Sequence, residues 1–279
     1  MNARETRHEG LDKFYTKPEI AKACISRIND WDALDLVVEP SAGNGNFFKH
    51  IPTTKKIGID IKPGCNSVIE KDFFKYVPKP GKILVIGNPP FGKNSSLAIK
   101  FFNHAASWAD TIAFIIPRTF RRTSIQNRLD MSFHLSHDED IPIKPCAFEP
   151  PMSVKCCFQI WVKREIRRNV IHLPVTHNDW EFLPFGPKDD RNQPTPPRNA
   201  DFAILAYGGA CGRIQTNGLQ KLRPKSWHWI KSNIDKTVLM RRFETLDYSI
   251  SENTARQNSL GRSDLVYLYS NSRRHGFKE

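Results

Sequence analysis

The fold is decided by residues 34–60, which read LDLVVEPSAGNGNFFKHIPTTKKIGID. Two short apolar runs, 36–38 and 56–59, are rich in β-branched residues and are closed by Glu-Pro and by Asp, which predicts two buried strands. Residues 45–50 between them have a composition that is compatible with a helix. A strand, a helix and a second strand in this order predict a parallel pair.

The same alternation continues as far as Arg164. Short β-branched runs are typical of strands buried on both faces, and the segments between them have helical length. Further strands are expected at 82–86 and 111–116, helices at 18–29 and 95–108, and later strands at 131–135 and 156–162, the final ones antiparallel at the edge. The fold class is therefore α/β, a doubly wound and mostly parallel sheet.

The character of the chain changes after Arg164. Prolines interrupt the sequence, and residues 186–200 have the composition of a long exposed loop or linker. Residues 201–207 and 211–215 read as strands joined by Gly208-Gly209, and 227–230 as the start of a helix. We expect two domains, 1–164 and a smaller, loop-rich region at 165–279.

The charge balance is strongly basic. The 42 Lys and Arg against 29 Asp and Glu give a net charge of +13, and the excess is +7 before and +6 after the boundary at Arg164. Such a charge favours an anionic partner. Binding to a membrane surface would call for a basic amphipathic helix or a lipidation signal, and the chain has neither. We expect nucleic acid as the partner. No apolar run approaches the length of a membrane span, so we expect a soluble intracellular protein, cytoplasmic or nuclear.

Polar and glycine residues follow three of the expected strands, where doubly wound sheets bind ligands. Glu39-Pro40-Ser41-Ala42-Gly43-Asn44-Gly45 closes the first strand, and it is neither a Walker A loop nor GxGxxG. Asp60 closes the second strand, where a carboxylate can accept both hydroxyls of a ribose. Asp72 precedes two phenylalanines and could accept an adenine amino group. Each feature alone is also an ordinary turn, cap or surface acid.

The fourth feature is Asn88-Pro89-Pro90-Phe91, which follows the strand expected at 82–86. Two prolines after an asparagine can continue neither a ladder nor a helix. They leave the Asn88 side-chain oxygen and the Pro89 carbonyl as rigid acceptors for the two N–H groups of an exocyclic amine. Gripping both hydrogens directs the nitrogen lone pair toward an electrophile, and Phe91 offers a flat surface for a base taken out of its stack.

Taken together, residues 13–164 resemble the class I S-adenosylmethionine-dependent amino-methyltransferases, in particular the N6-adenine enzymes. The resemblance implies S-adenosylmethionine as cofactor and a catalytic tetrapeptide of Asn88, Pro89, Pro90 and Phe91. The motif order is similar to the γ arrangement, in which the last region recognises the target nucleic acid. The cofactor-binding residues that it implies are Tyr15, Thr16, Glu39, Ala42, Gly43, Gly45, Asp60 and Asp72.

The resemblance implies methyl transfer to the N6 amine of adenine in DNA. The same motifs also occur with RNA adenine and with the N2 amine of guanine, and an inactive nucleic-acid-binding module remains an alternative. Direct transfer needs no metal and no nucleophilic cysteine, and Pro145-Cys146 is out of place for cytosine-C5 chemistry. The six cysteines form no CxxC pair, so we expect no metal site.

Two basic clusters are expected to contact the nucleic acid. Arg118, Arg121 and Arg122 follow the strand at 111–116, on the side of the sheet where the catalytic loop lies. Lys221, Arg223 and Lys225 alternate with aromatic residues at Trp227 and Trp229, a composition suited to backbone contact and base stacking. A solvated turn in the first cluster and a small core in the second are the competing interpretations.

Overall fold

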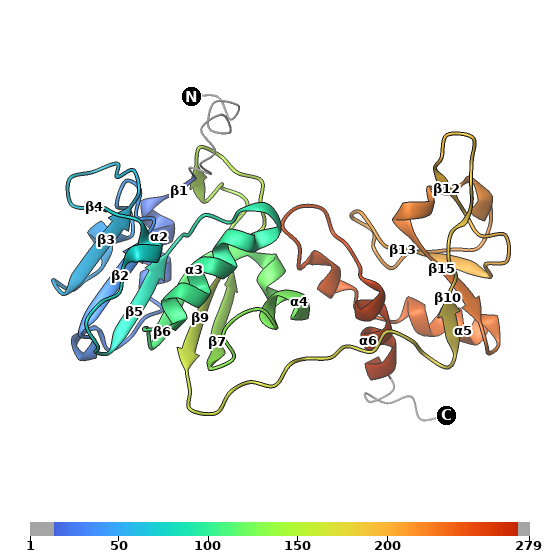
Figure 1. Cartoon of the computed structure of the whole chain (residues 1–279). Coiled ribbons are helices and arrows are strands. Elements are labelled where there is room, and N and C mark those ends of the chain that lie inside the picture. The colour runs from blue at the N-terminus through green and yellow to red at the C-terminus, as the bar shows by residue number, and fades with distance from the viewer. Residues whose placement is uncertain (1–13, 273–279) are drawn as a thin grey trace. The chain divides into compact units, whose positions relative to one another are not determined.

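The structure, a computed structural model, describes residues 14–272 (Figure 1). The chain divides into two compact units with the boundary between Val170 and Ile171, six residues beyond the boundary that we expected. Residues 164–176, around this boundary, form neither helix nor strand.

The first unit is built on a seven-stranded sheet in the order β4-β3-β2-β5-β6-β9-β7. All neighbouring strands are parallel except β9, which is antiparallel to both β6 and β7. The strands are β2 (Leu36–Pro40), β3 (Lys56–Asp60), β4 (Ile69–Glu70), β5 (Ile83–Gly87), β6 (Thr111–Pro117), β7 (Phe133–Asp140) and β9 (Cys156–Lys163). The predicted doubly wound, mostly parallel α/β sheet is confirmed. The antiparallel strand lies one place in from the edge, because β7 forms the edge itself.

Both faces of this sheet are buried. Val38 and Val85 face one cluster with α3 (Ser96–Ala106), whereas their neighbours Val37 and Leu84 face a second cluster with α2 (Pro18–Ile25). Strands covered on both faces read as continuous apolar runs, which is why they could be found in the sequence. The remaining elements of the unit are β1 (Tyr15–Thr16), which pairs with β8 (Phe148–Glu149), and the short helix α4 (Thr123–Gln126).

The helix expected at 45–50 is wrong. Only a short 3₁₀ turn, η2 (Phe48–His50), forms there, because Gly43 and Gly45 have φ of +53° and +74° and turn the chain tightly. The Lys56 ammonium then donates to the carbonyl oxygens of Phe48 and Ile51, at 2.7 and 2.8 Å. These carbonyls are thereby satisfied without a further helical turn.

The second unit contains a four-stranded antiparallel sheet in the order β10-β15-β13-β14. The strands are β10 (Trp180–Phe182), β13 (Phe202–Leu205), β14 (Ile214–Gln215) and β15 (Trp227–Ser232), and the helices are α5 (Lys236–Glu244) and α6 (Arg262–Ser272). The strands predicted at 201–207 and 211–215 are confirmed as β13 and β14, which form an antiparallel pair. The prediction of a helix from residue 227 is wrong. The side chains of β15 alternate between two apolar clusters, as a strand requires.

Residues 186–200, expected to be a linker, lie within the second unit. They contain a hairpin of β11 (Gly186–Lys188) and β12 (Pro194–Thr195). The hairpin is closed by Asp189, whose side chain accepts from the backbone N–H groups of Arg191 and Gln193. Within residues 14–272, no helix is long and apolar enough to cross a bilayer.

Candidate active site

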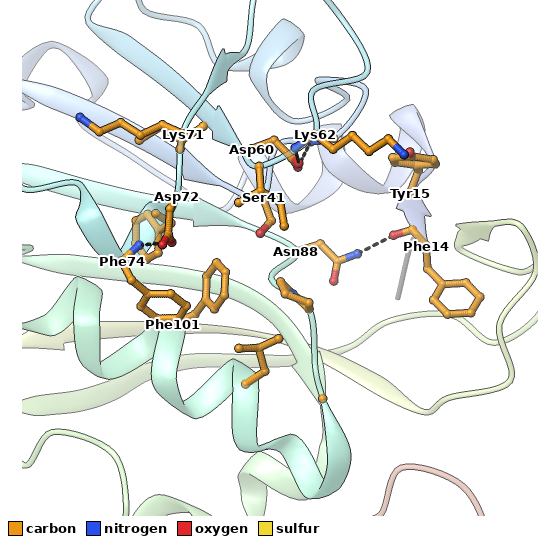
Figure 2. Close-up of a pocket in the computed structure, with 17 residues that line it drawn as sticks. Phe14, Tyr15, Ser41, Asp60, Lys62, Lys71, Asp72, Phe74, Asn88 and Phe101 are labelled. Atoms are coloured by element: carbon orange, nitrogen blue, oxygen red, sulfur yellow. Dashed lines mark hydrogen bonds between the residues drawn. The ribbon is translucent and has the colours of Figure 1, made fainter. Parts of the chain in front are cut away.

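A cavity of about 420 Å³ opens at the carboxyl ends of β2, β3 and β5 (Figure 2). Ligands bind at this edge in doubly wound sheets because the chain reverses its winding between the strands. Six of the residues predicted from the sequence line the cavity, namely Tyr15, Gly43, Asp60, Asp72, Asn88 and Pro90. The fold therefore brings together residues from five separate stretches of the chain.

Asn88 stands at the end of β5 with its side-chain amide fixed in one orientation. Its Nδ2 group donates to the carbonyl oxygen of Phe14 at 3.1 Å, as Figure 2 shows. The other amide atom, Oδ1, is buried and accepts no hydrogen bond within the described part of the chain. A buried carbonyl oxygen without a donor is unfavourable, so this atom is an acceptor available to a ligand.

The Asp60 carboxylate is held by the loops at the ends of β2 and β3. Its Oδ2 accepts from the Gly43 backbone N–H and its Oδ1 from that of Lys62, both at 2.8 Å. Each carboxylate oxygen can accept a second hydrogen bond, so these contacts orient the group and leave capacity for two hydroxyls. The Tyr15 ring covers Gly43, where an added Cβ would lie 2.7 Å from Tyr15 Cε1.

Asp72 lies in an aromatic part of the cavity. One of its oxygens accepts from the Phe74 backbone N–H at 3.0 Å and caps the short helix η3 (Phe73–Lys75). The Phe74 ring meets Phe101 edge-on at 4.9 Å, and Phe73 stacks on Phe101 at 5.1 Å. A flat heterocycle with an amino group would find apolar walls and a carboxylate acceptor here.

A second, smaller hollow of about 30 Å³ shares four lining residues with the first, which are Phe14, Tyr15, Ser41 and Asn88. It is lined by three further predicted residues, Thr16, Glu39 and Ala42. Thr16 Oγ1 and Glu39 Oε2 are buried without a hydrogen-bond partner among the described residues. Burial raises the pKa of Glu39, which is 3% exposed, well above 4.5. The hollow therefore presents polar atoms that an ammonium group or water could satisfy.

Three predicted residues do not line either space. Gly45 supplies a turn, with φ of +74°, and Pro89 is buried. Phe91 is partly buried and packs against both apolar clusters of the first unit. A role for Phe91 as a stacking surface stays a prediction.

The sequence analysis missed several residues of the cavity wall. Phe14 and Ser41 stand beside predicted residues, and Lys62 and Lys71 each lie one or two positions from an Asp of the site. Leu97 and Phe101 come from α3, whose amphipathic pattern signals a core rather than a ligand site. The residues near a motif could have been found by that proximity; they are Phe14, Ser41, Lys62 and Lys71. No signal in the sequence marked Leu97 or Phe101.

The first basic cluster is engaged in ion pairs. The Arg118 guanidinium contacts Asp140 at 2.7 Å, and Arg121 contacts both Asp138 and Asp140. The Arg118 residue is only 9% exposed, and Asp138 and Asp140 offset the charges of both arginines. These pairs give no support to phosphate contacts from Arg118 and Arg121, and Arg122 is untested.

The second basic cluster lies in the second unit, where Lys221, Arg223 and Lys225 are all exposed. Trp227 and Trp229 are 7% and 1% exposed and belong to an apolar cluster, so they are core residues and not stacking surfaces. The two halves of the predicted pattern thus separate into exposed cations and buried rings.

Among residues 14–272, neither a cluster of metal-binding side chains nor a cysteine lines the cavity. Residues 14–272 contain no group of His, Cys, Asp and Glu side chains arranged to hold a metal ion. All six cysteines are free, and none of them lines the cavity. Burial raises the pKa of the Cys24, Cys156 and Cys157 thiols, which opposes thiolate formation.

No protein-family model and no curated protein matches the chain. Among solved structures it is similar to the 23S rRNA methyltransferase ErmE, with 16% identity over 57% of this chain and 72% of that one, at a TM-score of 0.42. A dimethyladenosine transferase from Plasmodium falciparum has 20% identity over 54% of this chain and 63% of that one, at a TM-score of 0.40. A magnesium protoporphyrin IX methyltransferase from Synechocystis has 11% identity over 53% of this chain and 78% of that one, at a TM-score of 0.39. At these identities and TM-scores the matches assign no activity to this chain.

Proposed function

We propose that the protein is an S-adenosylmethionine-dependent methyltransferase that acts on the N6 amine of adenine in DNA. The observation that carries the proposal is the Asn88 Oδ1 atom, which is buried without a partner among residues 14–272, in a residue that lines the cavity. An acceptor in this position, with the Pro89 carbonyl next along the chain, suits a planar amine that must present both N–H groups.

The cavity suits the proposed cofactor in size and in polarity. Its volume of about 420 Å³ lies in the ordinary range of roughly 300–1,000 Å³ for small-molecule sites. Asp60 would accept the ribose hydroxyls, and Asp72 would accept the adenine amine between Phe74 and Phe101. The unpartnered oxygens of Thr16 and Glu39 would receive the ammonium of the methionine end. The residues present therefore fit S-adenosylmethionine.

The chain's own residues would then hold the target amine. S-adenosylmethionine supplies a methyl group bound to a positively charged sulfur. Asn88 Oδ1 and the Pro89 carbonyl each accept one amine hydrogen, which draws the nitrogen lone pair out of conjugation with the base. The contact from Asn88 Nδ2 to Phe14 holds the amide in the orientation that leaves Oδ1 to accept from the substrate. Phe91 would contact the face of the extruded base.

The deciding experiment is incubation of the protein with labelled S-adenosylmethionine and, separately, with duplex DNA, single-stranded DNA and RNA. The substrates are then digested and the methylated nucleoside is identified by mass spectrometry. We expect N6-methyladenine in DNA. N6-methyladenosine in RNA alone would move the activity to RNA, and N2-methylguanosine would refute adenine as the target.

Cofactor binding without transfer to any substrate would identify an inactive module instead. Binding of S-adenosylmethionine is measured by calorimetry in the same preparation. Absence of both binding and transfer would refute the proposed function altogether.

A further inference from the structure

One part of the second unit has an extreme charge imbalance. Residues 202–234 contain no Asp or Glu, although the flanking residues on both sides, Asp201 and Asp235, are acidic. The stretch carries five cations, which are Arg213, Lys221, Arg223, Lys225 and Lys231. It folds as β13, β14 and β15 together with two short 3₁₀ turns, η6 (Leu219–Lys221) and η7 (Pro224–Ser226).

The sheet formed by this stretch has two different faces. Phe202 and Ile230 join the apolar cluster formed with α5 and α6. Ala203, Trp227 and Trp229 join a separate cluster on the opposite face. Alternate residues of a strand point to opposite faces, so the helices cover one side and leave the tryptophan side to other elements.

The turns η6 and η7 cover the tryptophan side. The Trp229 indole donates to the Pro224 carbonyl at 3.2 Å, and Leu222 packs against the tryptophan cluster. The Arg213 guanidinium lies over the Trp227 ring, 5.6 Å from its centroid. The cations of the stretch are thus carried by the elements that surround the two tryptophans.

Four of the five cations have no acidic partner among the residues that the structure describes. Lys231 pairs with Asp201 at 3.3 Å. The other four are exposed, and none of them forms an ion pair with an acid of residues 14–272; they are Arg213, Lys221, Arg223 and Lys225. Arg118 and Arg121 of the first unit, in contrast, are paired with Asp138 and Asp140. Of the two predicted basic clusters, the one in the second unit therefore keeps its charge without acidic partners among residues 14–272.

We propose that these four residues, the basic face, bind the phosphodiester backbone of nucleic acid. The inference rests on the proposed function for the identity of the polyanion, and it adds where that polymer is held and by which contacts. Because Trp227 and Trp229 are buried, the face contacts phosphates and does not stack bases. Arg213, which the sequence analysis did not single out, is one of the contacts.

The experiment measures binding to the full-length protein without cofactor, so that it does not depend on methyl transfer. Fluorescence anisotropy follows a labelled duplex of about one and a half helical turns over a series of salt concentrations. The test variant is Arg223→Gln with Lys225→Gln. The matched control is Lys236→Gln with Arg241→Gln, which removes the same charge from exposed residues of α5 on the other side of the sheet.

We expect the test variant to raise the Kd at least 10-fold at low salt and the control to change it less than 3-fold. Loss of two phosphate contacts should reduce the slope of log K against log salt by about 1.8 on duplex DNA and about 1.4 on single strands. Thermal unfolding of both variants shows that the unit remains folded.

Equal weakening by the two variants would overturn the inference, because it would assign binding to net charge rather than to the basic face. Equal or stronger binding to vesicles of anionic lipid would overturn it as well. Parallel measurements with duplex DNA, single-stranded DNA and RNA identify the polymer. Binding that depends on the basic face without methylation of any substrate would refute the proposed function alone.

Discussion

The side chain of Asn88 is tied to the backbone of Phe14, 74 residues away in the chain, through a hydrogen bond of 3.1 Å from Nδ2 to the carbonyl oxygen. This contact satisfies Nδ2 and leaves Oδ1 as the buried amide atom without a donor among residues 14–272. The backbone of Phe14 therefore sets the orientation of the residue that we propose to hold the substrate amine.

Substitution of Asn88 tests that relationship. Asn88→Ala removes the acceptor and should lower kcat by about 10² to 10³-fold, the usual effect of removing one hydrogen-bonding group at a reacting centre. Asn88→Asp keeps an acceptor oxygen but loses the donor to Phe14, so a smaller loss is expected. Affinity for S-adenosylmethionine should change less than 3-fold in both. The control is Asn103→Ala, which removes an Asn contact to the Arg128 carbonyl outside the cavity. Full turnover by Asn88→Ala would refute the mechanism.

Asp60→Asn should weaken cofactor binding. The carboxylate accepts from the backbone of Gly43 and Lys62, and an amide in its place can accept with one atom only. Hydrogen bonds to charged groups contribute about 1.5–3 kcal/mol, so the Kd for S-adenosylmethionine should rise about 10 to 100-fold. Asp35→Asn is the matched control, because Asp35 likewise accepts from a backbone N–H, that of Lys82, away from the cavity. Calorimetry checks both, and equal affinity in the two variants would contradict the assignment.

Gly43→Ala should also weaken cofactor binding, for a steric reason. A Cβ at this position would lie 2.7 Å from the Tyr15 ring, and φ of +53° is unfavourable for a residue with a side chain. Either Tyr15 or the loop must then move, which should raise the Kd for S-adenosylmethionine at least 10-fold. Gly209→Ala, where nothing lies within 4 Å of the added atom, should bind the cofactor normally. Unchanged affinity in Gly43→Ala would show that the loop does not contact the cofactor.

Glu39 should make the stability of the protein fall with rising pH. Its pKa is raised in the folded state by burial, so the folded form retains a proton that the unfolded chain releases above about pH 4.5. This stabilisation is complete below the unfolded pKa and is lost, by up to about 1.4 kcal/mol per pH unit, as the pH rises toward the folded value. Denaturant unfolding between pH 5 and 8 should give a smaller decline for Glu39→Gln than for wild type. Glu70→Gln, an exposed control, should follow wild type.

His228 should produce the opposite dependence at acid pH. Burial lowers its pKa to about 4, and its Nε2 contacts the Leu260 carbonyl at 2.8 Å. The stabilisation is present above the unfolded pKa of about 6.5 and is lost as the pH falls toward about 4, by up to about 1.4 kcal/mol per pH unit. His228→Gln should flatten the unfolding free energy between pH 4.5 and 6.5. The exposed His172→Gln should not, and an identical effect of both variants would refute the assignment.

The parallel core of the first unit can be predicted from the sequence alone. Runs such as 36–38 and 82–86 are apolar because both faces of these strands are buried, and Pro40 and Pro89 stand at or shortly after the strand ends. The same logic located Asp60 and Asn88, since the carboxyl ends of parallel strands meet at one edge. Local chemistry therefore carried both the fold and the centre of the candidate site.

Ion pairs and strand pairing that join residues distant in sequence became visible only in the folded structure. The cations at 118–122 do not reveal in the sequence that Asp138 and Asp140 of β7 pair with Arg118 and Arg121. In residues 227–230, pairing with β13 and β10 and the burial of alternate side chains in two apolar clusters select a strand over a helix. Ion pairs and sheet ladders join residues far apart along the chain, so only the folded molecule shows which cations remain unpaired and which aromatic rings are buried.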